Sequence, residues 1–211
     1  LENNTRLAVW KIEEEECFFL EKVSLQRSIT HPHKRLQHLA GRYLLQYLFP
    51  QFPIDLILIA NTRKPYLEND TYHFSISHCA QFAAAIVSKE KRVGVDIEVE
   101  STKIELIKNK FTSNEELHRM GEMVDHLTPS VEANYLDSNK KLTLLWSCKE
   151  AVFKWYGLGG IAFKEDILFT KIVEINNSDI LSLISFKKYI PKQLLLHSRF
   201  FENVVLTYVV T

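Results

Sequence analysis

Two carboxylates alternate along residues 92–98, a short stretch whose other side chains are mostly apolar. If this stretch is a β-strand, its period of two places Asp96 and Glu98 on one face together with Gly94. Like charges this close repel by ~1 kcal/mol in bulk water unless a cation lies between them. Mg²⁺ prefers such oxygen ligands. The stretch predicts a magnesium site where Gly94 lets a phosphate approach the backbone; the alternative is an ordinary edge strand with a polar face.

A second group of chemically capable side chains lies within residues 146–154. At helical spacing, Glu150 and Lys154 are one turn apart on a polar side, beside Trp146 and Phe153. The simplest interpretation is a surface pair that stabilises the helix by about 0.3 to 0.5 kcal/mol. The flanking aromatic rings favour instead a partly enclosed cleft, in which a carboxylate and an ammonium group handle a metal ion and a phosphate.

A basic turn with Lys64 and Pro65 precedes a predicted strand that ends in Ser77 and His78. A hydroxyl and an imidazole can both donate hydrogen bonds to phosphate. A Ser–His pair without an acid to orient the histidine is weak support for a hydrolase, and a strand end with satisfied polar groups is the usual alternative. The sequence contains neither a nucleophile elbow nor a glycine-rich loop that would cradle phosphates.

These side chains need helices and strands to position them. Apolar residues at helical spacing predict helices at 34–49 and 141–156, with Pro50 and Gly157 as their stops. Weaker helical patterns cover 104–110 and 115–127, where Ser113 and Glu116 form a capping box, and a polar loop is expected at 128–139. Strands are predicted at 5–12, 54–60, 72–77, 82–87 and 92–98, and an antiparallel meander at 167–175, 183–187, 194–201 and 204–210.

The turn at residues 88–91 predicts that strands 82–87 and 92–98 form a hairpin. Each half of the chain then offers a long helix and several strands. This arrangement predicts an α+β fold that is pseudo-duplicated.

Composition limits the function classes. The 211 residues are 46% hydrophobic, which is enough for a large core, and 26 basic residues balance 26 acidic ones. This balance argues against nucleic acid as a partner. The three cysteines have neither disulfide-framework nor zinc-site spacing, so we expect a reducing, cytoplasmic environment. No apolar run approaches the ~18 residues of a membrane span, and the first residues lack a signal-peptide pattern, so no membrane partner is expected.

Five motifs in a fixed order resemble the 4'-phosphopantetheinyl transferase superfamily, of the single-chain surfactin-synthetase-activator type. They are KP at 64–65, SISH at 75–78, GVDIE at 94–98, FTSNE at 111–115 and WSCKEAVFK at 146–154. Each motif alone is weak, whereas their order makes the resemblance specific. It implies a pseudo-dimer of two similar halves, residues 1–100 and 101–211. Each half would have a long helix on a small antiparallel sheet, with the active site between them and the metal-binding strand in the first half.

The resemblance also implies roles for individual residues. Asp96, Glu98 and Glu150 would hold Mg²⁺, and Glu115 would help to deprotonate the attacking serine, although an acid in the first turn of a helix is favoured anyway. Glu150 and Lys154 would take part in catalysis. The residues implied to bind coenzyme A are Arg35, Arg42, Lys64, Pro65, Ser77, His78, Lys149 and Lys154, with His31, His33 and Lys34 as competitors of the two arginines for the 3'-phosphate.

The implied reaction moves 4'-phosphopantetheine from coenzyme A to a serine of an apo acyl or peptidyl carrier protein and releases adenosine 3',5'-bisphosphate. A monomer suffices, because a pseudo-dimer completes its own site. Acidic carriers would dock on Lys103, Lys108, Lys110 and Arg119. The alternatives are a pseudoenzyme that only binds coenzyme A or the carrier, and an unrelated magnesium-dependent phosphotransferase or nuclease, which the lack of a basic bias disfavours.

Overall fold

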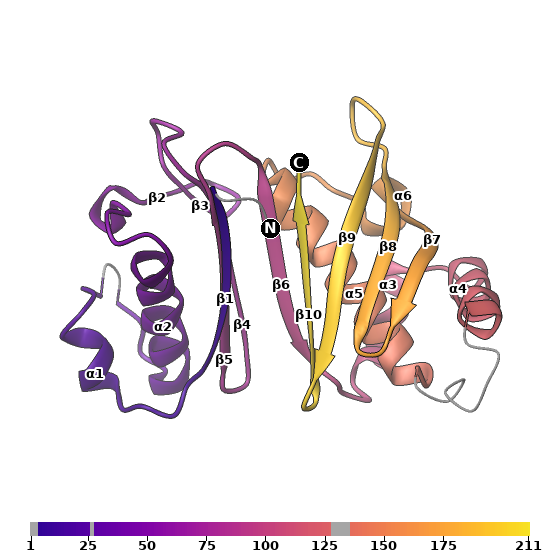
Figure 1. The fold of residues 1–211 in the computed structure, drawn as a ribbon, viewed down its shortest axis with the longest axis horizontal. Coiled ribbons are helices and arrows are strands. Elements are labelled where there is room, and N and C mark those ends of the chain that lie inside the picture. Colours follow the sequence, from indigo (N-terminus) through magenta and orange to yellow (C-terminus); the bar gives the residue numbers. More distant parts are fainter. Residues whose placement is uncertain (1–3, 26–27, 128–135) are drawn as a thin grey trace.

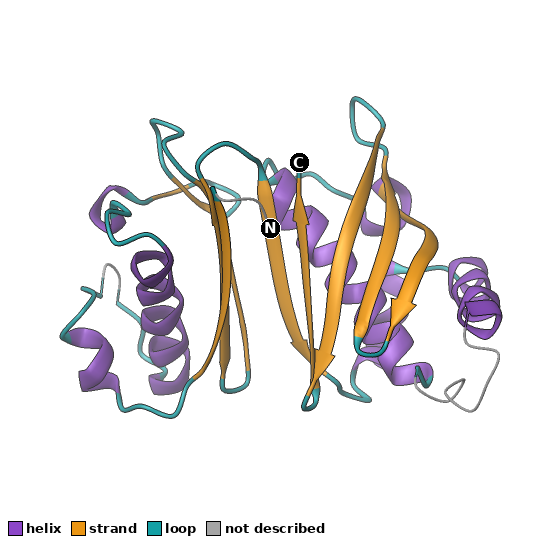
Figure 2. Ribbon diagram, viewed as in Figure 1, coloured by secondary structure: helices purple, strands orange, loops and turns teal. Residues whose placement is uncertain are grey.

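Two antiparallel sheets pack face to face, and a long helix covers the outer face of each (Figures 1 and 2). The computed structural model describes residues 4–25, 28–127 and 136–211. Three hydrophobic clusters separate the layers: one lies between the sheets, and the other two lie between each sheet and its helix. The chain is therefore α+β, as predicted.

The first sheet has three strands in the order β1-β5-β4, and helix α2 covers one of its faces. Pro32 at the start of α2 fits the first helical turn, where its missing N–H is not needed. The predicted strand at 54–60 is wrong, because a 3-10 turn precedes only two strand residues there. The elements of this half are β1 (Thr5–Lys11), α1 (Glu16–Leu20), α2 (Pro32–Leu48), η1 (Ile54–Leu56), β2 (Leu58–Ile59), β3 (Pro65–Tyr66), β4 (His73–Cys79) and β5 (Phe82–Ser88).

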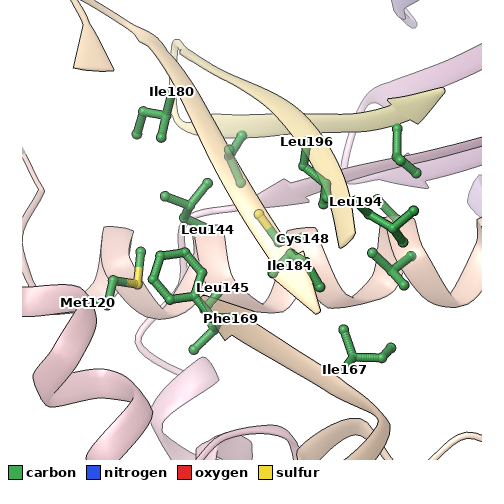
Figure 3. Packing of buried hydrophobic residues seen from close by; sticks show 14 of the residues in the cluster. Met120, Leu144, Leu145, Cys148, Ile167, Phe169, Ile180, Ile184, Leu194 and Leu196 are labelled. Carbon is green, nitrogen blue, oxygen red and sulfur yellow. The ribbon is translucent and has the colours of Figure 1, made fainter. Parts of the chain in front are cut away.

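The second sheet has five strands in the order β6-β10-β9-β8-β7, and helix α5 crosses its outer face. Figure 3 shows Leu145 and Cys148 of α5 among the apolar side chains of the strands, including Phe169, Leu194 and Leu196. The elements are β6 (Val93–Val99), α3 (Ile104–Phe111), α4 (Asn114–Leu127), α5 (Ser138–Tyr156), α6 (Phe163–Asp166), β7 (Ile167–Asn176), β8 (Asp179–Phe186), β9 (Lys192–Phe201) and β10 (Val204–Val210).

The predicted hairpin of β5 with β6 is wrong. Strand β5 is the central strand of the first sheet, so β1 and β4 already occupy both of its edges. Its side chains are buried along its whole length, as expected for a strand covered on both faces. Strand β6 pairs instead with β10, so the turn at 88–91 carries the chain from one sheet to the other. By its hydrogen bonds, β6 therefore belongs with the second half of the chain rather than with residues 1–100.

Gly94 has a different role from the one expected. A Cβ atom at this position would overlap with the carbonyl oxygen of Ala151 and lie 2.7 Å from the backbone nitrogen of Trp155. The space beside Gly94 is thus filled by helix α5 and is not open to a phosphate. Glycine is needed here because α5 packs directly against the backbone of β6.

Helix α5 begins at Ser138, where the side chain of Asp137 accepts a hydrogen bond from the Lys140 N–H at 2.9 Å. It ends at Gly157, which has a left-handed φ of 77°. Of the loop predicted at 128–139, residues 128–135 lie outside the described residues. In the described ranges, no helix has the length and apolar character needed to cross a membrane.

Candidate active site

Helix α5 and strands β4 and β6 bring three polar side chains together where α5 lies beside the adjoining edges of the two sheets. Asp96 of β6 is only 1% exposed. Its Oδ1 atom accepts hydrogen bonds from Lys154 Nζ at 2.6 Å and from Ser77 Oγ at 2.9 Å. Lys154 Nζ also donates to Ser77 Oγ at 2.7 Å. The three groups therefore form a closed triangle that joins one residue from each element.

The second oxygen of Asp96 is different from the first. Oδ2 is buried and has no hydrogen-bond partner among the described residues. A buried carboxylate oxygen without a partner is costly, because it has lost its hydration and gained nothing in return. This atom is the strongest sign that a ligand completes the site.

Two more carboxyl groups share this environment. Glu98 Oε1 accepts a hydrogen bond from Trp146 Nε1 at 3.0 Å. Burial and the charge of Asp96 raise the pKa of Glu98 to about 7, against the opposing effects of Trp146 and Lys154. Burial also raises the pKa of Glu150 to about 7, although Lys154 counteracts it. The two glutamates therefore titrate near neutral pH, chiefly because burial disfavours their charged forms.

The lysine responds in the opposite way. Burial alone would lower the pKa of Lys154, but attraction to Asp96, Glu150 and Glu98 raises it. Lys154 thus stays charged and neutralises part of the acidic cluster. Among the residues that the structure describes, no three Asp, Glu, His or Cys side chains are grouped closely enough to hold a metal ion as they stand. The donor types suit Mg²⁺, while the present side-chain positions do not form a finished ligand set.

The Lys149 side chain does not lie where a residue that binds coenzyme A is expected. It is fully buried and points into the second half of the chain. Its Nζ atom donates to the carbonyl oxygens of Phe111 at 2.7 Å and Phe163 at 3.0 Å, and to Glu116 Oε2 at 2.9 Å. An ammonium group has three donors, so none remains for a phosphate. The assignment of Lys149 to the cofactor is therefore corrected: it is a buried structural lysine.

The acid beside Lys149 is Glu116, which is buried, whereas Glu115 is exposed. The Glu115 side chain is 84% exposed and forms an ion pair with Arg119 at 3.2 Å. The capping-box pattern had already marked Glu116, and its N–H does donate to Ser113 Oγ at 3.1 Å. In a full capping box, the Glu116 carboxylate would also accept a hydrogen bond from the Ser113 N–H. Here it points inward and pairs with Lys149 instead.

A cavity of about 190 Å³ adjoins the triangle and extends from Lys154 to Lys64. Pro65 and Phe153 line it. Thr62 Oγ1 donates to the Gly157 carbonyl at 3.2 Å, which ties the loop before β3 to the end of α5. Burial, and then the nearby Arg92, lower the pKa of Lys64 to about 8. The predicted turn with Lys64 and Pro65 therefore lies at one end of a cavity that has Lys154 at the other.

The remaining candidates lie on or next to the first sheet. His78 is on β4, one residue beyond Ser77, with an exposed side chain. Arg35 and Arg42 are on α2, which covers the opposite face of the first sheet from β6. Arg35 forms an ion pair with Glu16 at 2.6 Å, and Arg42 is 3% exposed. The competitors His31, His33 and Lys34 are exposed at the start of α2.

The chain is similar to several curated proteins over part of its length. The chain is 32% identical over 122 residues to enterobactin synthase component D of Salmonella austin, covering 57% of this chain and 47% of that protein. The proteins of the same name from Salmonella typhi and Salmonella typhimurium are 32% identical over 127 residues and 29% over 124, with the same coverage. The chain thus spans about half the length of the curated relatives it matches.

A family match covers the part of the chain that contains Asp96 and Lys154. The model of the 4'-phosphopantetheinyl transferase superfamily matches residues 92–209. This range begins just before β6, includes α5 and its two polar clusters, and ends within β10. Because the match includes more than half of the residues, the chain belongs to the 4'-phosphopantetheinyl transferase superfamily.

Proposed function

We propose that this protein transfers the 4'-phosphopantetheine group of coenzyme A to a serine of an apo acyl or peptidyl carrier protein, releasing adenosine 3',5'-bisphosphate. The observation that carries the proposal is the triangle of Asp96, Ser77 and Lys154, in which one buried oxygen of Asp96 lacks a partner. An anionic pocket that already contains a lysine can bind a metal ion and a diphosphate together. The type of reaction is inferred from membership of the 4'-phosphopantetheinyl transferase superfamily.

Coenzyme A is proposed to lie along the cavity between Lys154 and Lys64. Lys154 and Ser77 would contact the pyrophosphate, since both already point to the position next to Asp96. Lys64 and Pro65 would border the adenine end of the same cavity. His78 remains a proposed contact of the pyrophosphate, and Arg35 and Arg42 remain the proposed contacts of the 3'-phosphate. Lys149 is left out, because its donors are used inside the fold.

Magnesium is proposed to bind Asp96, Glu98 and Glu150. The unpartnered Oδ2 of Asp96 and the raised pKa values of both glutamates fit a cation in this place, because it would relieve their mutual repulsion. The three side chains would have to draw closer together than they lie here. When bound, the metal would supply charge neutralisation to the pyrophosphate. Lys154 would stabilise the charge that develops on the leaving group, and Trp146 would hold Glu98 in place.

Glu115 remains the proposed acceptor of the serine proton. It is exposed on α4 and its ion pair with Arg119 leaves it open to solvent, whereas Glu116 is committed to Lys149. A Glu115→Gln variant that transfers at the wild-type rate would remove this role.

The carrier is proposed to dock on α3 and the start of α4. Lys103 and Lys110 are exposed there, and Leu106 is 83% exposed between them. Lys108 and Arg119 are partly neutralised by Glu105 and Glu115, so Lys103 and Lys110 should contribute most. A Michaelis constant for the carrier that does not change from low to high salt would exclude docking by charge. We further propose a cytoplasmic monomer that binds neither nucleic acid nor membrane.

The decisive experiment is mass spectrometry of apo carrier proteins incubated with this protein, coenzyme A and Mg²⁺. The wild type should add one 4'-phosphopantetheine per carrier, and Glu150→Ala should add none within the same time. Thermal-shift titrations with coenzyme A, with and without Mg²⁺, run in parallel. Binding without transfer across a panel of carriers would indicate the non-catalytic alternative, and neither binding nor transfer would refute the proposal.

A further inference from the structure

Strands β4 and β6 are neighbouring edges of two different sheets. Their backbones pair with β5 and β10 respectively, so no described ladder joins them. They nevertheless lie side by side. The β4 face toward β6 carries His73 at the start of the strand and then three small side chains: Ser75, Ser77 and Cys79. Small side chains allow the close approach that the Asp96 site needs.

A hydrogen bond from the backbone of β6 to a side chain of β4 takes the place of ladder hydrogen bonds between these two strands. The Val95 N–H, on the free edge of β6, donates to Ser75 Oγ at 3.1 Å. Ser75 is 3% exposed and Val95 is fully buried. A buried edge N–H needs an acceptor, and here it finds one in a side chain of the other sheet. The next residue along β6 is Asp96, and the next residue on the same face of β4 is Ser77.

We propose that Ser75 is a positioning residue of this site. Its hydroxyl fixes the distance and the offset of β6 against β4, and thereby the 2.9 Å contact of Ser77 with Asp96 and the 2.6 Å contact of Lys154 with Asp96. Among the described residues, Ser75 forms no hydrogen bond with these groups, and it lines the cavity beside them. The inference rests on the proposed transferase activity for its kinetic readout, but its structural readout does not depend on that activity.

The contact between β4 and β6 explains why serine suits position 75. Alanine would keep the small size but leave the Val95 N–H buried without an acceptor. Threonine would retain the acceptor at the cost of one extra methyl group. Asparagine would keep an acceptor on a longer side chain and push the strands apart. Size and acceptor are thus separable by substitution.

Ser88 offers a matched control. Its hydroxyl is also fully buried, and it accepts a backbone hydrogen bond from the Lys91 N–H at 3.0 Å. It lies at the end of β5, paired with His73 and Thr5, and among the described residues it forms no hydrogen bond with the Asp96 site. Ser75→Ala and Ser88→Ala both remove an acceptor of a backbone N–H, and Ser88→Ala also removes the hydrogen bond with Thr5 Oγ1 at 2.8 Å.

The experiment compares wild type, Ser75→Ala, Ser75→Thr and Ser88→Ala in the full chain. Amide hydrogen exchange by NMR should show faster exchange at Val95 in Ser75→Ala only, with protection restored in Ser75→Thr. Steady-state transfer should show kcat reduced by about ten- to a hundredfold in Ser75→Ala, with an unchanged Michaelis constant for the carrier, because misplaced groups slow the chemical step. Ser75→Thr should recover most of kcat, and Ser88→Ala should keep it.

Three results would overturn the proposal: an unchanged kcat in Ser75→Ala, an equal loss of kcat in Ser88→Ala, or unchanged Val95 exchange in Ser75→Ala. If the wild type shows no transfer at all, the proposed function fails. In that case the Val95 exchange rate and the coenzyme A affinity measured by calorimetry still test whether Ser75 positions the site. A tenfold weaker coenzyme A affinity in Ser75→Ala with Mg²⁺ would support it, and an unchanged affinity would refute it.

Discussion

Lys149 and Lys154 lie five positions apart on helix α5, and each contacts a buried carboxylate in a different way. Lys149 pairs with Glu116 inside the second half of the chain, and Lys154 pairs with Asp96 where α5 and β6 adjoin the edge of the first sheet. The Lys149 side chain is 0% exposed, whereas that of Lys154 is 25% exposed. One ion pair is sealed in the core, and the other borders a cavity.

The two carboxylates differ even more. Both oxygens of Glu116 have partners: Oε2 accepts from Lys149 and from Thr112 Oγ1 at 2.7 Å, and Oε1 accepts from the Phe169 N–H at 2.6 Å. Asp96 has partners on one oxygen only among the described residues. A fully satisfied buried pair holds the fold in one arrangement. A buried pair with an unsatisfied oxygen is incomplete, as expected at a site where a ligand is proposed to bind.

The largest effect is expected from breaking the sealed pair. Lys149→Met would leave Glu116 buried without its cation and the carbonyls of Phe111 and Phe163 without a donor. Removing one partner of a buried pair costs about 3 to 5 kcal/mol of unfolding free energy. Urea denaturation followed by circular dichroism measures this loss.

A double variant distinguishes the lost pair from a packing defect. Lys149→Met combined with Glu116→Gln removes the uncompensated charge, so it should recover part of the stability. A Lys149→Met variant as stable as wild type would show that the pair is not structural. The contrast between a structural Lys149 and a site residue Lys154 would then be wrong.

Breaking the open pair should affect activity more than stability. Lys154→Met removes the donor to Asp96 and Ser77 and the cation that neutralises Glu98 and Glu150. Loss of one such group typically slows a reaction by about 10² to 10³. Transfer to an apo carrier, followed by mass spectrometry, gives the rate. Lys154→Met should lose less unfolding free energy than Lys149→Met, and the reverse order would contradict the assignment of their roles.

Most of the scaffold could be predicted from periodicity. The helices containing Leu44 and Leu145 and the four-strand meander after residue 166 have patterns that their local sequence determines. The pairing of β6 could not be predicted, because a turn at 88–91 suits a hairpin and a crossover equally. Only the positions of β1 and β4 on both edges of β5 exclude the hairpin, and those pairings are long-range.

Some features of the candidate site could likewise be predicted from the sequence, and others could not. Asp96, Ser77 and Lys154 were marked by residue type and order, and the structure brings these three together. Lys149 and Glu150 are adjacent in sequence, but a helix turns them about 100° apart, so only packing decides which one lies in the core. Gly94 was marked correctly as special, but the atom that needs its space belongs to α5, which sequence spacing does not reveal.

The acidity of the open site makes stability depend on pH. The pKa values of Glu98 and Glu150 are raised to about 7 from the ordinary value of 4.5, chiefly by burial. Between these values the folded protein holds protons that the unfolded chain releases, so unfolding free energy falls as pH rises from about 4.5 to 7 and levels off above it. We expect a change on the order of 1 kcal/mol, because Lys154 and solvent screen both groups.

Denaturation midpoints across this pH range measure the effect. The double variant Glu98→Gln and Glu150→Gln should flatten the curve, because neither amide titrates. Adding Mg²⁺ should flatten it too, by favouring the charged carboxylates. A curve that rises through this range instead would mean that Lys154 outweighs the burial of both glutamates.

The smallest effect on stability is expected from breaking an exposed ion pair. Lys11 on β1 contacts Glu202, in the turn between β9 and β10, at 3.1 Å, and the two side chains are 40% and 50% exposed. This pair joins the two sheets, as the hydrogen bond of Ser77 with Asp96 does, but it is exposed to water. Lys11→Gln should cost only about 0.2 to 1 kcal/mol and leave transfer unchanged. The difference should vanish in 1 M salt, where charges are screened beyond roughly 3 Å, whereas the cost of Lys149→Met should persist. A salt-insensitive loss in Lys11→Gln would mean that the contact of its stem with the apolar surface matters more than its charge.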